Sequence, residues 1–462
     1  MKETAFRRLV SGAIFCLALL GPAFADLTDD QKKTLASIAK VDDYPVYTMT
    51  YYGDYGFDEY LKRGIVTTRR PSAARPSASV RDGCSCFGAL AAGGDKLYGR
   101  NLDLLKLYPV LIMWTDPPKG FASVSLNIAV EIELYLDNPT EEHIQWVLEY
   151  PYWCFDGMNE YGVAVSGLSV EGERVYDPDK ITLGRYDMRR LILDYARTVD
   201  EAVRLVSAYN NQDSDTVHYL VSDAHGASAV IEYHDGAVNA HRAAEPWQAV
   251  TNFLLRGRPA DSVLGLCRRY EKVYRALQAA GGRCDQSQGM EILKSVFRNR
   301  EPAGDGAFVY TVWSAIYNMT TGDLGLCPGS RFDNLETAKL GMVRDLSVRS
   351  ARAAKTTLRR AENAKFTARI VNASPRPSLK TTLKFYLAKG RKVGAGSVAL
   401  GQTIVPALAA NRGLTVAGKK RVPATAAPGA YRLIAVVDPL SRNNDPAPSN
   451  NTYVWTKTIT VK

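Results

Sequence analysis

Hydrophobic and polar residues alternate along this chain with two different periods. Between residue 84 and about residue 331, strand-like runs of period two are interrupted by a helical pattern over 186–209. This mixture predicts an α+β domain. The main predicted strands are 110–114, 123–128, 163–168, 217–223, 227–233, 247–253, 310–317 and 324–326.

The helical pattern over 186–209 contains a Thr198-x-x-Glu201 sequence, which is a capping box and predicts the start of a second helix. Its apolar stripe is expected to face the core. Its charged residues, including Arg189 and Arg190, are expected on the solvated face.

The pattern changes after residue 340. Short alternating runs separated by turns continue to the C-terminus with no convincing helix, which predicts a β-sandwich over 340–462. The predicted strands are 345–348, 364–372, 379–387, 413–416, 430–437 and 453–461.

Charge also separates the two regions. Residues 340–462 contain 22 Lys and Arg against 4 Asp and Glu, or +18, whereas the whole chain carries only +10. Such a basic surface would attract anionic cell-surface polymers, although it could equally serve only to keep a small domain soluble. No basic motif interleaved with aromatic residues is visible, so we expect no nucleic-acid partner.

The first residues predict export. Residues 1–25 combine Arg7 and Arg8 with a short apolar run and a small-x-small end at Ala23–Ala25, which is typical of a signal peptide. The apolar run is too short for a permanent membrane span. We therefore expect a periplasmic or secreted protein.

Residues 26–83 form a predicted pro-segment. Residues 30–39 have a helical pattern, and the aromatic-rich stretch 44–60 has an extended or turn-like one. The Pro-, Ser-, Ala- and Arg-rich stretch 69–77 predicts an exposed linker. The aromatic residues favour continued packing of this segment on the domain that follows.

Removal of the signal peptide leaves six of the seven cysteines. If one is a free nucleophile, five remain and at most two disulfides form; Cys267 and Cys284 are one conceivable pair. No paired C-x2-C is present and the five histidines are scattered, so the spacing predicts no metal site and no cofactor.

The candidate chemistry centres on Cys84. The run Gly83–Phe87 and the run Leu97–Asp103 flank a glycine turn and predict a β-hairpin, which would return Arg100 and Asp103 to the side of Cys84. A thiol needs a base and charge stabilisation to react as a thiolate. The α-amino group of Cys84 could be that base if the bond after Gly83 were cut.

Cys84, followed sixteen positions later by Arg100 and then by Asn101 and Asp103, resembles the N-terminal-nucleophile hydrolases. The group concerned comprises choloylglycine hydrolases, penicillin V acylases, acyl-CoA:6-aminopenicillanic acid acyltransferase and acid ceramidases. The resemblance implies self-cleavage to expose Cys84, hydrolysis of a linear non-peptide amide, and a four-layer αββα sandwich over 84–339. The motifs of 340–462 resemble CARDB modules with an immunoglobulin-like fold.

The resemblance also implies further site residues. Asn252, at the end of a strand, is the expected oxyanion-hole donor. Arg269 matches an arginine of the family, with Arg268 as the alternative. Ser169 stands where some members have an oxyanion-hole Asn, and Asn159 is either near the site or a turn-capping residue.

Several readings stay open from the sequence alone. An acyltransferase of the same fold would need water to be excluded from the second step. A non-enzymatic protein could bind surfaces through 340–462, and a cysteine peptidase could use one of the four histidines at 218–241. Cys86 competes with Cys84 as nucleophile, but only Cys84 gives the sixteen-residue offset to Arg100.

Overall fold

The computed structural model describes residues 27–42, 44–65, 83–90, 94–303, 306–329, 331–374, 377–440, 443, 445 and 448–462. The predicted signal peptide and the 69–77 linker lie outside these residues. The chain divides into two compact units, one with residues up to 319 and 323–340, and one with 320–322 and 341–462.

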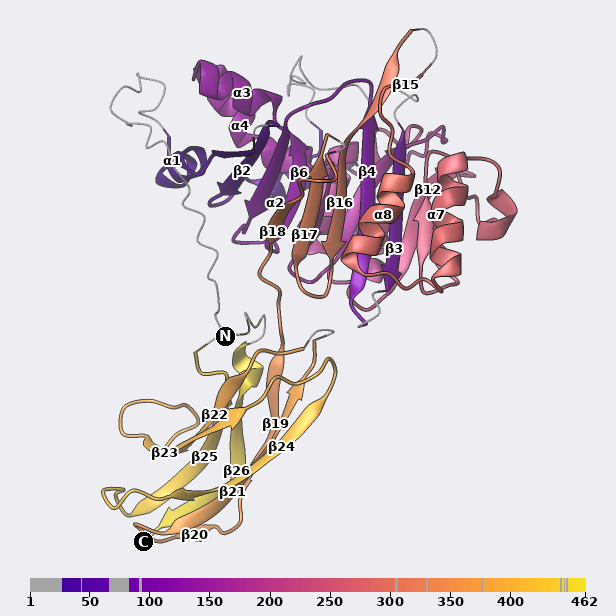
Figure 1. Ribbon diagram of the computed structural model, residues 1–462. Helices are drawn as coiled ribbons and strands as arrows, with labels where there is room; N and C mark the ends of the chain where they lie inside the picture. The colour runs from indigo at the N-terminus through magenta and orange to yellow at the C-terminus, as the bar shows by residue number, and fades with distance from the viewer. Residues whose placement is uncertain are drawn as a thin grey trace. The chain divides into compact units, whose positions relative to one another are not determined.

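The larger unit is built on two sheets (Figure 1). The first has nine strands in the order β1-β2-β5-β6-β7-β8-β11-β12-β13, antiparallel except for the parallel pair β2 and β5. Its strands are β1 (Ala39–Asp42), β2 (Val46–Tyr51), β5 (Val110–Thr115), β6 (Ser123–Ile128), β7 (Asp156–Asn159), β8 (Ala164–Ser169), β11 (Val217–Ser222), β12 (Ser228–His234) and β13 (Ala237–Arg242).

The second sheet runs β14-β3-β4-β16-β17-β18, with β15 paired to β16. Its strands are β3 (Cys84–Leu90), β4 (Lys96–Leu104), β14 (Gln248–Val250), β15 (Glu301–Pro302), β16 (Phe308–Asn318), β17 (Asp323–Pro328) and β18 (Glu336–Lys339). A small parallel pair, β9 (Thr182–Leu183) and β10 (Asn210–Asn211), lies apart from both sheets.

Helices cover the outer face of each sheet. One apolar core joins the nine-stranded sheet to a helical layer, and α7 and α8 pack on the second sheet. The inner faces meet, as the hydrogen bond from Tyr98 Oη on β4 to the Leu220 carbonyl on β11 shows. This gives the four-layer αββα arrangement. The helices of the larger unit are α1 (Asp29–Ala36), α2 (Phe57–Arg63), α3 (Val130–Asp137), α4 (Glu141–Leu148), η3 (Tyr150–Trp153), α5 (Arg185–Tyr195), α6 (Val199–Ser207), η4 (Ala260–Val263), α7 (Arg268–Ala279) and α8 (Gln286–Ser295).

The predicted helix break is confirmed, because α5 ends at Tyr195 and Thr198 caps α6 by accepting a hydrogen bond from Glu201 N. The expected exposure of Arg189 and Arg190 is wrong, since both are buried. Arg190 can be buried because its guanidinium pairs with Asp194 at 2.7 Å.

The aromatic N-terminal segment is part of the larger unit. β2 extends the nine-stranded sheet beside β5, and Tyr55 and Phe57 are buried against Tyr152. The extended pattern predicted over 44–60 is right for β2 and wrong for α2. Phe57 anchors this helix in the core, which overrides the local aromatic pattern.

The smaller unit is a two-sheet all-β sandwich with its own apolar core. One sheet runs β19-β21-β24 and the other β20-β26-β25-β22-β23. The sandwich prediction is confirmed, although β20 and β23 were not anticipated. The elements are β19 (Leu346–Ala353), β20 (Thr357–Leu358), β21 (Asn363–Asn372), β22 (Thr381–Ala388), β23 (Val398–Val405), β24 (Gly413–Arg421), β25 (Gly429–Val437), η5 (Pro448–Asn451) and β26 (Thr452–Val461).

All six cysteines in the described residues are free thiols. The pairing of Cys267 with Cys284 is wrong for a geometric reason. Cys267 precedes α7 and Cys284 follows it, and a helix of this length separates its two ends by roughly 18 Å. Among the described helices, none is both long and apolar enough to cross a bilayer.

Replacing Tyr55 with Phe should destabilise the larger unit by about 2 kcal/mol, the usual value of a buried hydrogen bond to a charged group. Tyr55 Oη donates to Asp194 Oδ2 at 2.6 Å inside the core. Urea unfolding followed by circular dichroism measures the change. Tyr52→Phe is the matched control because Tyr52 is exposed, and equal effects of the two variants would contradict the prediction.

Candidate active site

The β3–β4 hairpin places Cys84 at the first position of a strand. Cys84 lies opposite Leu102, Cys86 lies opposite Arg100, and the Asp103 amide donates to the Gly83 carbonyl at 2.9 Å. The two strands can pair closely here because Gly99 has no side chain. An added Cβ at this position would fall 2.3 Å from the ring of Phe87. The predicted hairpin is therefore present, and Cys84 lies where the chain enters it.

Asn252 lies beside the Cys84 main chain. β14 pairs with β3, with Val250 opposite Cys86, so the residue two positions later reaches the start of β3. The Cys84 main-chain N–H donates to Asn252 Oδ1 at 2.6 Å, and Asn252 Nδ2 donates to the Ser169 carbonyl at 2.7 Å. The Asn252 amide thus has its oxygen toward the Cys84 nitrogen.

Arg269, in the first turn of α7, is the arginine that reaches this position. Its Nη1 donates to the Cys84 carbonyl and, at 3.0 Å, to Ser85 Oγ, while its Nη2 donates to Asn252 Oδ1 at 3.0 Å. Arg268 is exposed. Of the two arginines considered from the sequence, the geometry favours Arg269.

Asp103 is a fully buried carboxylate next to these groups. Thr311 Oγ1 donates to its Oδ1 at 2.7 Å, and its Oδ2 lies 3.7 Å from Arg269 Nη1. Burial raises the pKa of the Asp103 carboxyl above its usual value, against the opposing effects of Arg269 and Thr311. Asp103 therefore depends on these partners to hold its charge.

Arg100 is also fully buried, and its guanidinium contacts several groups. Its Nη2 donates to the Gly167 carbonyl at 3.1 Å, and its Nε lies 3.5 Å from Asp156 Oδ2. Burial opposes its charge, but Cys84, Cys86 and Asp156 outweigh burial and hold the pKa of the guanidinium well above its usual value.

Cys86 is a poor candidate for a nucleophile. Its side chain is enclosed in the protein, and burial raises the pKa of this thiol to about 12, despite the nearby Arg100. Arg100 Nη1 donates to Cys86 Sγ at 3.5 Å. Cys86 therefore contributes to packing around Arg100.

Cys84 is also buried, but unlike Cys86 it lines a pocket between the two sheets. Apolar walls come from Leu102 and Phe155, and polar groups come from Ser169 and Arg189. Arg189 is fixed by hydrogen bonds to two carbonyls, and its guanidinium lies 4.3 Å from the ring centre of Tyr186. A small molecule entering this pocket would meet a thiol, an apolar surface and a cation.

Other residues considered from the sequence lie elsewhere. Asn159 donates to the Leu193 and Ala196 carbonyls and accepts from two amides, so it stabilises a turn. The sequence left open that one of the four histidines at 218–241 is the catalytic partner of a cysteine peptidase. Of these, His218 is engaged by hydrogen bonds to Glu232 and to the Thr251 carbonyl.

Sequence reasoning missed Thr311, Asp156 and Ser85 at the site. Thr311 and Asp156 come from strands distant along the chain, and no local motif marks them. Ser85 is next to Cys84 and could have been noticed, but its contact with Arg269 needs α7 to be in position.

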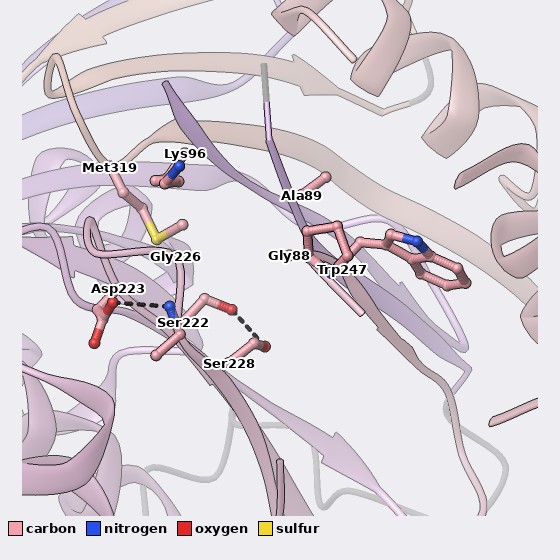
Figure 2. Close-up of a pocket in the computed structure, with 11 residues that line it drawn as sticks. Gly88, Ala89, Lys96, Ser222, Asp223, Gly226, Ser228, Trp247 and Met319 are labelled. Atoms are coloured by element: carbon pink, nitrogen blue, oxygen red, sulfur yellow. Dashed lines mark hydrogen bonds between the residues drawn. The ribbon is translucent and has the colours of Figure 1, made fainter. Parts of the chain in front are cut away.

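Figure 2 shows another pocket, toward the other end of β3, where Gly88 and Ala89 line it. Ser222 Oγ and Ser228 Oγ lie 2.9 Å apart there, and an added Cβ at Gly88 would fall 2.6 Å from Ser222 Oγ. None of the described residues that line it is a cysteine or a histidine. We therefore assign the candidate active site to the Cys84 pocket.

Residues 90–252 match the model of the family described as linear amide C–N hydrolases, choloylglycine hydrolase family. This confirms the resemblance noted from the sequence. No curated protein matches the chain.

Solved structures similar to this chain include two amide hydrolases and a CARDB domain. A mutant conjugated bile acid hydrolase from Clostridium perfringens is 14% identical with a TM-score of 0.43, covering 56% of this chain and 92% of its own. Penicillin V acylase from Agrobacterium tumefaciens is 18% identical with a TM-score of 0.41, covering 56% and 87%. A CARDB domain from Pyrococcus furiosus is 16% identical with a TM-score of 0.20, covering 27% and 95%.

Replacing Asp156 with Asn should destabilise the protein by about 3 kcal/mol, because it leaves the buried Arg100 without its carboxylate. Urea unfolding monitored by tryptophan fluorescence measures the change. Asp215→Asn is the control, since Asp215 forms an exposed ion pair with Arg174 and should matter little. A stability change no larger than that of the control would show that Arg100 does not depend on Asp156.

Proposed function

We propose that this chain is an amidohydrolase that cleaves the carbon–nitrogen bond of a linear, non-peptide amide, with Cys84 as its nucleophile. The observation that carries the proposal is the hydrogen bond of 2.6 Å between the Cys84 main-chain nitrogen and Asn252 Oδ1, beside a pocket lined by the Cys84 side chain. The match of residues 90–252 to linear amide C–N hydrolases supports the reaction class.

The first step is self-cleavage between Gly83 and Cys84. Cys84 Sγ attacks the Gly83 carbonyl carbon, and the Asp103 amide, 2.9 Å from the Gly83 oxygen, stabilises the oxyanion. The carbon–nitrogen bond then breaks, the Cys84 nitrogen takes the thiol proton, and a thioester remains. Water hydrolyses the thioester and leaves Cys84 with a free α-amino group.

The same residue then acts on the substrate. The α-amino group, oriented by Asn252 Oδ1, takes the proton from Cys84 Sγ as the thiolate attacks the amide carbonyl. Asn252 Nδ2 is the proposed oxyanion donor, and Asp103 with Arg269 fixes the charge around the amine. The amine product leaves with a proton, and water releases the acyl group from the thioester.

The pocket suggests what the substrate must contain. Leu102 and Phe155 offer apolar contact area for an acyl chain, and Arg189 offers a cation that can bind a carbonyl or an anionic group. Conjugated bile acids, penicillins and N-acylated amines all combine these elements.

The N-terminal segment is expected to stay bound after cleavage. β2 pairs along its whole length with β5, and the hydrogen bond from Tyr55 to Asp194 joins the segment to α5. Loss of the segment would expose the apolar face that Tyr55 and Phe57 cover. The mature enzyme would then consist of two non-covalently associated chains.

Export and surface attachment complete the proposal. The signal-like residues 1–25 support a periplasmic or secreted location. Residues 340–462 contain 22 Lys and Arg but only 4 Asp and Glu, and this positive charge supports attraction to an anionic surface polymer.

Intact mass spectrometry of the purified full chain should find a fragment that begins at Cys84, together with its N-terminal partner. Cys84→Ala should remain uncleaved because no thiol attacks the Gly83 carbonyl. Cys86→Ala, the matched control, should be cleaved as in the wild type. If the enzyme is active while its chain is intact between Gly83 and Cys84, the proposal is wrong.

A panel of conjugated bile acids, penicillin V, N-acyl lactones and N-acyl sphingoid amides, assayed for amine release, should contain at least one substrate. On that substrate, cleaved Asn252→Ala should lose about 100-fold in kcat, as expected for one oxyanion donor. Arg269→Lys should also lose activity because the two-pronged contact with Cys84 and Asn252 is lost. Arg268→Lys is the control, and equal effects of the two lysine variants would reject the role of Arg269.

A further inference from the structure

Three potential metal ligands converge on β12 and β13, away from the residues assigned to catalysis. His234 Nε2 and His241 Nε2 lie 3.1 Å apart, and Glu232 Oε2 lies 3.1 Å from His241 Nε2 and 3.7 Å from His234 Nε2. We propose that Glu232, His234 and His241 bind a divalent transition-metal ion of the zinc class. This inference is independent of the proposed amidase activity.

The three distances suit one ion. Ligand atoms at about 2.1 Å from a tetrahedral zinc ion lie roughly 3.4 Å from one another. The three observed separations are 3.1, 3.1 and 3.7 Å, so they lie within about 0.3 Å of this value. Two imidazoles and one carboxylate are also ligands that zinc accepts, with a water molecule in the fourth position.

The strand register produces this convergence. Glu232 and His234 are two positions apart on β12 and therefore share one face of the sheet. β13 runs antiparallel with Asn239 opposite Glu232, so His241 lies diagonally across from Glu232 on the same face. The sequence spacing gave no metal signal because the third ligand arrives only through this pairing.

Surrounding groups orient the three ligands. Asp235 Oδ2 lies 2.7 Å from His234 Nδ1, which presents Nε2 to the centre of the cluster. The buried Glu232 accepts from the Leu255 amide at 2.7 Å and from the Arg256 amide at 2.9 Å. His241 keeps 17% of its side chain exposed, which gives an ion a route from solvent.

The cluster is linked to the segment that carries Asn252. His218 Nδ1 lies 3.3 Å from Glu232 Oε1, and His218 Nε2 lies 2.8 Å from the Thr251 carbonyl. An ion at this site would hold β12, β13 and residues 251–256 together. Its role would be structural, since none of the three ligands lines the Cys84 pocket.

The test uses the full chain without a polyhistidine tag, stripped with a chelator and titrated with Zn²⁺ by calorimetry. One equivalent per chain is expected, and Co²⁺ in its place should give the visible absorption of a tetrahedral site. His234→Gln and His241→Gln should each bind Zn²⁺ at least about tenfold more weakly. His225→Gln is the matched control, because His225 is exposed in the β11–β12 turn and should bind as the wild type does.

Asp235→Asn keeps all three ligands and should weaken Zn²⁺ binding by about 10- to 100-fold through the loss of the carboxylate behind His234. Asp235 has a φ of 54°, a conformation that Asn tolerates, so this variant decides the question even if a histidine variant does not fold. Zn²⁺ affinity unchanged in Asp235→Asn, or less than one equivalent bound by the wild type, would overturn the assignment.

Discussion

The hydrogen bond between the Cys84 main-chain nitrogen and Asn252 Oδ1 is the contact on which the candidate active site depends. It joins residues 168 positions apart and forms because β14 completes the sheet beside β3. Asn252 is held in turn by the Ser169 carbonyl on the opposite sheet and by Arg269 from α7. One amide side chain thus ties both sheets and one helix to the position of a single nitrogen atom.

This arrangement requires charged groups to be buried. Asp103, Arg100 and Asp156 are all fully enclosed between the layers, where an unpaired charge would be costly. Each has partners: Thr311 and Arg269 for Asp103, and Asp156 with the Gly167 carbonyl for Arg100. Side chains buried among such partners have little freedom to rearrange, so the charges around Cys84 are fixed before any substrate arrives.

The chain before Cys84 belongs to the same structure. β2 and α2 belong to the nine-stranded sheet and its aromatic core, so the layers facing the β3–β4 hairpin include residues from both sides of Gly83. A cut at that position would create a free amino group without removing any layer. The basic 341–462 unit has a separate apolar core.

The sequence by itself determined the local elements and identified Cys84 as the candidate nucleophile. Period-two patterns predicted β5, β6, β8, β16 and the strands of the sandwich other than β20 and β23, and the capping box at Thr198 predicted the start of α6, because these features depend on neighbouring residues. Only the tertiary structure decided that Arg189 and Arg190 are buried, that Arg269 and not Arg268 reaches Cys84, and that Thr311 supports Asp103. It also decided that Glu232, His234 and His241 converge. These outcomes depend on strand register and on layers packing across long separations in the chain, and no short sequence pattern records such distances.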